Sequence, residues 1–231
     1  MNGIAIIDES QGDSGLTLTN GNALCHVLQK QIAQAATMYR YATCPVIWLS
    51  PGSPMPQGYW PIYILKDPDV AGALGYHDVD PNGHPYGRVF SSVCKQAGVS
   101  LSSVLSHEVL EAWVDPYAND WSDQGTRCIA HEACDPVQNS SYLIDGIEVS
   151  NFVTRRWFDN GAVRADGKFD WLGHLTAPFQ LESGGYLIVM QDGRVSQVFG
   201  EGEGMTGYRA LVADAPQPSR STWRSARELI S

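Results

Sequence analysis

Residues 106–111, with the sequence SHEVLE, carry the side chains of this chain that are best suited to chemistry. On a helix, His107 and Glu111 are four positions apart and lie on the same side, so both can reach one metal ion. Glu108 falls between them, where a general base can act on a metal-bound water. The spacing therefore predicts a metal site in which Glu108 is the catalytic residue.

The helix that carries this motif is expected to cover residues 100–114 and to end before Pro116, because proline disfavours helical geometry in the residue that precedes it. At about 100° per residue, His107, Glu111 and Glu108 share one sector of the helix. Apolar residues occupy much of the remaining surface, and no lysine or arginine occurs among the acids. This pattern favours a helix at the floor of a cleft over a solvated surface helix.

A zinc site with an open position for water needs a third protein ligand from outside the first helical turn. Glu132 is the leading candidate, with His131 as its alternative. Asp135 can orient His107 by accepting its second ring N–H, or it can itself be the ligand. Asp115 lies about 12 Å along the helix axis from His107, at 1.5 Å per residue, so it fits better as a helix-terminal acid or as a group that supports a ligand.

The composition disfavours several classes of protein. The chain has 231 residues and a net charge of −10, with no lysine and arginine cluster before the C-terminal tail, which disfavours binding to nucleic-acid phosphates. No run approaches the ~18 apolar residues of a membrane span. The N-terminus lacks the pattern of a classical signal peptide, so we expect a cytoplasmic or virion protein. The five cysteines form no CxxC pair, and reduced thiols are favoured over a Cys128–Cys134 disulfide.

Periodicity and turn residues predict the other elements. Apolar residues at helical spacing indicate a helix from Asn22 to about Tyr41. Asp-Gly turns indicate two hairpins, around residues 145–146 and 192–193, whereas the stretch between Pro116 and Ser141 has no regular pattern. Strands are expected at residues 3–7, 45–50, 59–65, 75–78 and 86–90. We expect an α+β globular domain over residues 1–212, a linker at 213–220 and a C-terminal tail helix at 221–231.

Several positions form a wider pattern: residues 106–116, Trp121, Glu132, Asp135 and residues 149–152. They resemble the pattern SHExxExxx(D/N)P…W…ExxD of zincin-like proteins, which include the plant exordium (phosphate-induced) proteins and uncharacterised bacterial and bacteriophage proteins. The approach to the helix at residues 75–90 resembles the latter group more closely. The resemblance covers about residues 60–160. It implies a zincin-like metallopeptidase fold, in which a mixed sheet accompanies an active-site helix that supplies His107 and Glu111 as ligands and Glu108 as base.

In zincins an edge strand lines the substrate cleft just before the active-site helix. The resemblance therefore implies that His77 can contact substrate, although a histidine beside a turn is more often a simple turn residue. The chain departs from the exordium pattern in two respects: it lacks a secretory signal, and Cys134 precedes Asp135 instead of following it.

The expected function is that of a zinc-dependent hydrolase, with a peptide as substrate and with His107, Glu111 and Glu132 as metal ligands. A carboxylate at position 111 adds negative charge, so the bound water is less acidic and Mn²⁺ or Ca²⁺ becomes an alternative to zinc. A competing hypothesis is a non-catalytic structural or virion (bacteriophage) component that retains this fold and forms a homo-oligomer or larger assembly through the locally basic C-terminal tail. A third is a metal-free domain in which the acids form an ordinary hydrogen-bonded network.

Overall fold

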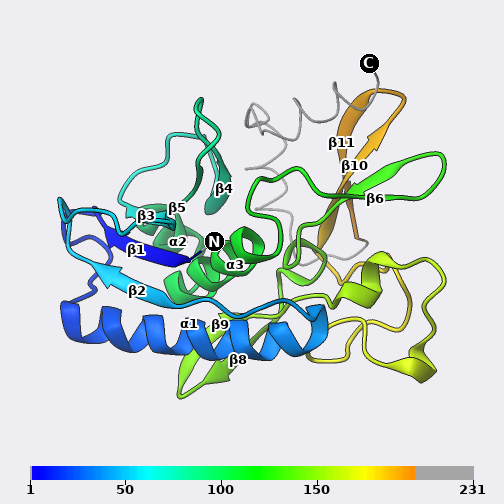
Figure 1. Ribbon diagram of the computed structural model, residues 1–231, viewed down its shortest axis with the longest axis horizontal. Helices are drawn as coiled ribbons and strands as arrows, with labels where there is room; N and C mark the ends of the chain where they lie inside the picture. The colour runs from blue at the N-terminus through cyan, green and yellow to red at the C-terminus, as the bar shows by residue number, and fades with distance from the viewer. Residues whose placement is uncertain (1, 201–231) are drawn as a thin grey trace.

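The computed structural model describes residues 2–200 of the chain. The predicted linker (213–220) and tail helix (221–231) lie outside these residues. The described part combines a mixed five-stranded sheet with helices packed on it, beside a smaller sheet and a hairpin (Figure 1). The α+β class predicted from the sequence is therefore confirmed.

The strands and helices are as follows. The strands are β1 (Gly3–Asp8), β2 (Val46–Leu49), β3 (Tyr59–Leu65), β4 (Gly75–Val79), β5 (Pro85–Phe90), β6 (Trp121–Asp123), β7 (Cys128–Ala130), β8 (Ser141–Ile144), β9 (Ile147–Ser150), β10 (Tyr186–Gln191) and β11 (Arg194–Phe199). The α-helices are α1 (Leu18–Tyr39), α2 (Ser91–Ala97) and α3 (Leu101–Val114), and the 3-10 helices are η1 (Asp135–Val137), η2 (Arg155–Phe158) and η3 (Arg164–Asp166). The predicted strands, hairpins and motif helix are present, whereas α2 was not expected.

The larger sheet has the strand order β2-β1-β3-β5-β4. Its first four strands are parallel, and β4 pairs antiparallel with β5 at the edge. The inner strand β1, between β2 and β3, is a nearly continuous buried apolar run, as expected where both faces of a strand are covered. Helix α1 packs on β2, α3 packs on β4 and β5, and the two helices contact each other, with α1 below α3 in Figure 1. The motif helix therefore lies directly against the edge strand.

Helix α1 begins four residues earlier than its apolar periodicity predicts. The reason is a capping box, in which the Thr17 side chain accepts the backbone N–H of Asn20 and the Asn20 side chain accepts that of Thr17. The helix ends where Arg40 adopts a left-handed conformation with φ 59°. Neither α1 nor another helix in the described residues is long and apolar enough to cross a membrane.

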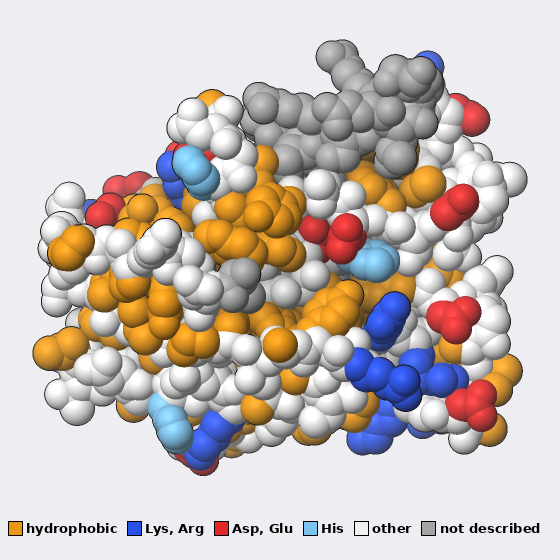
Figure 2. All heavy atoms as spheres, viewed as in Figure 1, with side chains coloured by type: hydrophobic (Ala, Val, Ile, Leu, Met, Phe, Trp, Pro, Cys, Tyr) orange, Lys and Arg blue, Asp and Glu red, His pale blue; other side chains and the backbone are white. Residues whose placement is uncertain are grey.

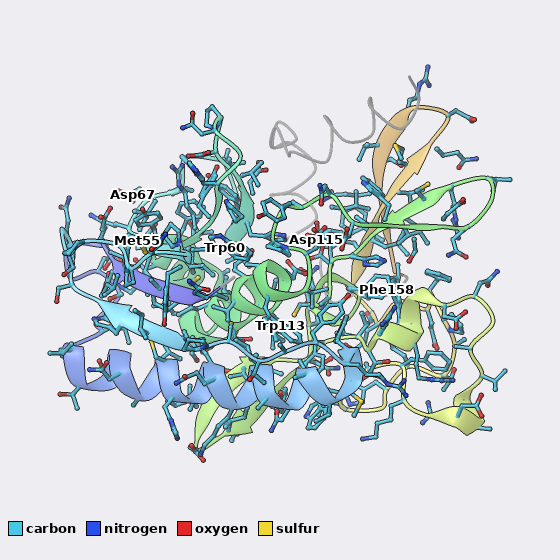
Figure 3. All side chains as sticks on the ribbon, viewed as in Figure 1. Met55, Trp60, Asp67, Trp113, Asp115 and Phe158 are labelled. Carbon is cyan, nitrogen blue, oxygen red and sulfur yellow. The ribbon has the colours of Figure 1, made fainter. Side chains whose placement is uncertain are left out.

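Helix α3 is anchored on both sides by hydrogen bonds to other segments. The Ser106 hydroxyl accepts the backbone N–H of Ser150 in β9 at 2.8 Å and donates to the carbonyl of Ser103 at 2.7 Å. On the side that faces α1, the Trp113 indole donates to the carbonyl of Ala42 at 3.1 Å, and its ring packs edge-on against Tyr39 (Figure 3). These contacts hold the motif helix in position independently of the residues of the candidate site.

The stretch predicted to be irregular contains two short strands and a 3-10 turn. Strands β6 and β7 have three residues each and join the second sheet, which has the order β11-β10-β7-β6. Ile129 pairs with Val189 of β10, so these strands depend on a partner that is about 60 residues away in the chain. After β7 the chain returns to α3, so residues 131–137 lie beside that helix.

Replacing Ser106 with alanine should destabilise the fold. The substitution leaves the buried N–H of Ser150 without its acceptor, which costs about 1–3 kcal/mol in the free energy of unfolding. Chemical denaturation followed by circular dichroism measures this loss. Alanine at Ser196, an exposed serine of β11, is the matched control and should change little. Equal stability of the two variants would show that the Ser106 hydrogen bond contributes nothing net.

Candidate metal centre

Three segments bring two histidines and four acids together. Helix α3 supplies His107, Glu108 and Glu111 from the predicted motif. The edge strand β4 supplies His77, and the turn between β7 and η1 supplies the remaining acids, Glu132 and Asp135. His77 and all four acids are almost fully buried, at 1–6% exposure.

His107 lies between two carboxylates. Its Nε2 is 3.1 Å from Glu111 Oε2 and 3.1 Å from Asp135 Oδ1. Two donors about 2.1 Å from one tetrahedral ion are separated by about 3.4 Å, so each carboxylate by itself has a spacing that suits a cation shared with His107. Within the described residues, Asp135 belongs to neither of the two compact groups of potential metal donors. The structure therefore places Asp135 where it can either orient His107 or share a metal ion with it, the two alternatives that the sequence left open.

Glu111 joins the helix to the turn that carries Glu132 and Asp135. Its Oε1 accepts the backbone N–H groups of Cys134 at 3.0 Å and Asp135 at 3.3 Å. These two bonds fix the carboxylate plane and leave Oε2 directed at the histidines. The same bonds explain why the turn lies against the helix at this point.

His77 occupies the centre of the cluster. Its Nδ1 is 3.7 Å from Glu111 Oε2 and 3.8 Å from Glu108 Oε2, and its Nε2 is 3.8 Å from Glu132 Oε2. Donor atoms of His77, Glu111 and Glu132 all lie within 4.8 Å of one another, as do those of His107, Glu108 and Glu111. Glu132, predicted as a ligand beside His107, thus lies beside His77.

His77 was predicted as a residue of the substrate cleft, not as a metal ligand. The available signal was the alternation of side chains along a strand, because residue 77 must face the side of the sheet opposite to Tyr76 and Asp78. The missing information was which side faces the motif helix.

Asp115 and His131 have structural surroundings of their own. The carboxylate of Asp115 accepts the backbone N–H groups of Asn119 and Asp120 at 3.1 and 2.8 Å, so it closes the turn after α3 on the side away from Trp113 (Figure 3). His131 Nε2 lies 2.8 Å from the Ser122 hydroxyl. Within residues 2–200, His131 belongs to neither group of potential metal donors.

A small cleft of about 60 Å³ opens beside His107 and Glu108. A Cβ atom at Gly75 would lie 2.8 Å from Glu108 Oε1 and 2.9 Å from the carbonyl oxygen of Arg88, so only glycine leaves room for the Glu108 carboxylate against the edge strand. Further residues of the cleft wall are Leu74, Ser103, Val104, Gln138 and Tyr186. One histidine and one carboxylate of the cluster are thus accessible from this cleft.

The edge strand β4 has a set of backbone groups that do not pair with β5. Phe90 N–H donates to Leu74 O, and Asp80 N–H donates to His84 O, both at 2.9 Å. Because antiparallel hydrogen-bonded pairs alternate, the even-numbered residues of β4 bond to β5 and the odd-numbered ones point away. The outward backbone groups belong to Gly75, His77 and Val79.

The electrostatics of the cluster reflect burial and crowding of charge. Burial alone would lower the pKa of His77, but Glu132, Glu108 and Glu111 outweigh it and raise this pKa to about 10. Burial raises the pKa of Glu111 to about 7, even though His107 opposes the shift. Burial alone would likewise lower the pKa of His107, but the neighbouring acids, led by Glu111, hold this pKa well above its ordinary value. Positive charge therefore stabilises the buried acids, and bound protons supply this charge when no metal is bound.

The residues present fit a bound divalent cation. His77 Nε2, Glu108 Oε2 and Asp135 Oδ2 are buried and have no hydrogen-bond partner within the described residues. Such atoms are costly to bury unless they are coordinated or hydrogen-bonded. Imidazole nitrogen with carboxylate oxygen is a donor set that suits zinc and manganese. All five cysteines are free, which agrees with the expected reduced thiols.

Comparisons with protein-family models, with curated proteins and with solved structures found no match for this chain. A function must therefore be derived from the site itself.

Metal removal should make stability depend on pH in a defined direction. Without metal, the folded chain binds more protons than the unfolded chain in two pH ranges. Glu111 holds an extra proton between its ordinary pKa of 4.5 and its raised pKa of about 7, and His77 does so between 6.5 and about 10. The free energy of unfolding should therefore fall as pH rises across this range. A metal must displace these protons, so stabilisation by zinc should grow with pH.

Thermal melts in EDTA and in excess zinc, from about pH 5.5 to 8.5, measure both trends. A metal-free melting temperature that rises over this range, or a zinc effect independent of pH, would contradict this electrostatic account.

Proposed function

We propose that this chain is a zinc-dependent hydrolase with a zincin-like fold, acting on peptide bonds. The observation that carries the proposal is the buried His107–Glu111–Asp135 contact at the floor of a cleft that Glu108 also lines. Protein ligands would hold a metal ion at this point on the side away from the cleft. The coordination position that faces the cleft would stay open, as catalytic zinc sites require.

The fold supports the same proposal. A mixed sheet ends in one antiparallel edge strand, β4, and the motif helix α3 packs against that edge. This is the arrangement that the resemblance to zincin-like proteins implies. The outward backbone groups of Gly75 and His77 in β4 are suited to an extended peptide, which can add to a strand edge through main-chain hydrogen bonds, whereas the Val79 N–H already donates to Asp78 Oδ1 at 2.8 Å.

Each residue has a role in this proposal. Bound zinc supplies a Lewis acid and a more acidic water. His107 and Glu111 hold the ion, with Asp135 or Glu132 as the third ligand. Glu108 takes a proton from the attacking water and passes it to the leaving amine. Gly75 leaves the space in which Glu108 lies against the edge strand.

The acidic donor set affects the choice of metal. Carboxylates outnumber imidazoles here, which weakens the activation of a bound water relative to a site with two imidazoles. Hydrolysis should therefore favour pH values above neutral. Manganese is the best alternative ion, because the two histidines make an all-oxygen calcium site a poorer fit.

Glutamine at position 108 tests the catalytic role. Glu108→Gln should keep the metal and lower hydrolysis of a peptide library by about 10²–10⁴-fold, because the proton carrier is lost. His107→Ala should lose the metal as well. Elemental mass spectrometry and a fluorogenic peptide assay on the same samples measure both. His26→Ala, at an exposed position of α1, is the control and should retain both properties.

Hydrolysis unchanged by Glu108→Gln would remove Glu108 from the mechanism. A native protein that binds no metal even when zinc is supplied would sink the enzyme proposal. A non-catalytic role in a larger assembly would then be the better explanation.

A further inference from the structure

We infer that the cluster holds two divalent metal ions that share Glu111, with His107 and Asp135 on one side of it and His77 and Glu132 on the other. The inference rests on the metal site of the proposed function and extends it from one ion to two. It concerns the number and position of the ions and can be tested without any measurement of hydrolysis.

The donors divide into two sets by distance. His107 Nε2 is within 3.1 Å of both Glu111 Oε2 and Asp135 Oδ1. His77 instead faces Glu132, 3.8 Å from its Nε2, while its Nδ1 lies 3.7 Å from Glu111 Oε2. Glu111 is the residue that both histidines approach, and it belongs to both groups of potential metal donors.

One zinc ion would leave donors unused. A catalytic zinc takes three protein ligands and keeps one open position. His107 and Glu111, with Asp135 or Glu108 beside them, satisfy that requirement alone. His77 would then remain in the core at 6% exposure, with Nε2 lacking a hydrogen-bond partner in the described residues. A second ion among His77, Glu111 and Glu132 gives this buried imidazole a ligand role through one of its two ring nitrogens.

The charge balance points the same way. Within residues 2–200, no lysine or arginine forms an ion pair with Glu108, Glu111 or Asp135. Figure 2 shows most of the basic side chains of this face toward its lower right, with others at its lower left and upper left. Metal-bound imidazoles are neutral. These three carboxylates already exceed the charge of one divalent ion.

Glu111 is held so that one of its oxygens can lie between two ions. Its Oε1 is occupied by two backbone N–H groups, and its Oε2 faces both histidines. Bridged metal pairs in hydrolases are typically about 3.5–4 Å apart. Such a pair provides two Lewis acids that act on the attacking and leaving oxygens, and Glu108 remains beside the cleft to carry the proton.

Metal counting on the native full chain is the first test. Elemental mass spectrometry after saturation with Mn²⁺ or Zn²⁺ and desalting should give two ions per chain. Electron paramagnetic resonance of the Mn²⁺ form should show a spin-coupled pair, because the two ions share one carboxylate. One ion per chain with an uncoupled spectrum would overturn the inference.

Single substitutions then assign the ions. His77→Ala should reduce the count from two to one and abolish the coupled spectrum, and Glu132→Gln should weaken the same ion. The control His26→Ala should keep both ions. If His77→Ala still binds two ions, His77 is no ligand and the inference fails. If His77→Ala does not fold, the native count and spectrum still decide the matter.

The outcomes separate this inference from the proposed function. A single ion that His107→Ala removes, together with hydrolysis, would leave the zinc hydrolase standing and refute the pair. Two coupled ions without hydrolysis of any peptide would confirm the pair and refute the hydrolase.

Discussion

Carboxylates that leave water lose hydration and repel one another, so a protein core that gathers several of them must supply compensating charge and hydrogen bonds. In this protein α3, β4 and the segment around the start of η1 pack together around such a group of carboxylates. The backbone of residues 134–135 supplies two N–H groups to Glu111, and two imidazoles face the acids. The remaining positive charge has to come from protons or from metal ions. The packing of three distant segments thus depends on how one small acidic centre is neutralised.

Much of the fold is visible in the sequence because it depends on local patterns. The buried run of β1, the period of α1 and the Asp-Gly turns of two hairpins each specify an element without help from its neighbours. The elements that escaped prediction are short. Helix α2 has seven residues and β6 and β7 have three each, and such segments form only because a partner strand or helix is already in place.

The candidate site divides in the same way. His107, Glu108 and Glu111 were predictable because helical spacing alone brings them to one side. His77 is 30 positions before the motif, and its face depends on how β4 sits on α3, which one sequence does not specify. The separation of Asp135 from Glu132 is set by the backbone of a turn whose conformation follows from its bonds to Glu111. Long-range geometry, not residue type, was the missing information.

The edge strand β4 has a consequence for the behaviour of the protein in solution. A row of outward backbone groups that can accept a peptide can also accept a strand from another copy, and such edges promote aggregation. Two features counter this tendency. The strand is only five residues long, and its ionisable side chains, His77 and Asp78, are buried on opposite faces of the sheet. Short length and buried charge are established protections against edge-to-edge pairing, so the same features that build the cleft also help to keep the molecule from self-association.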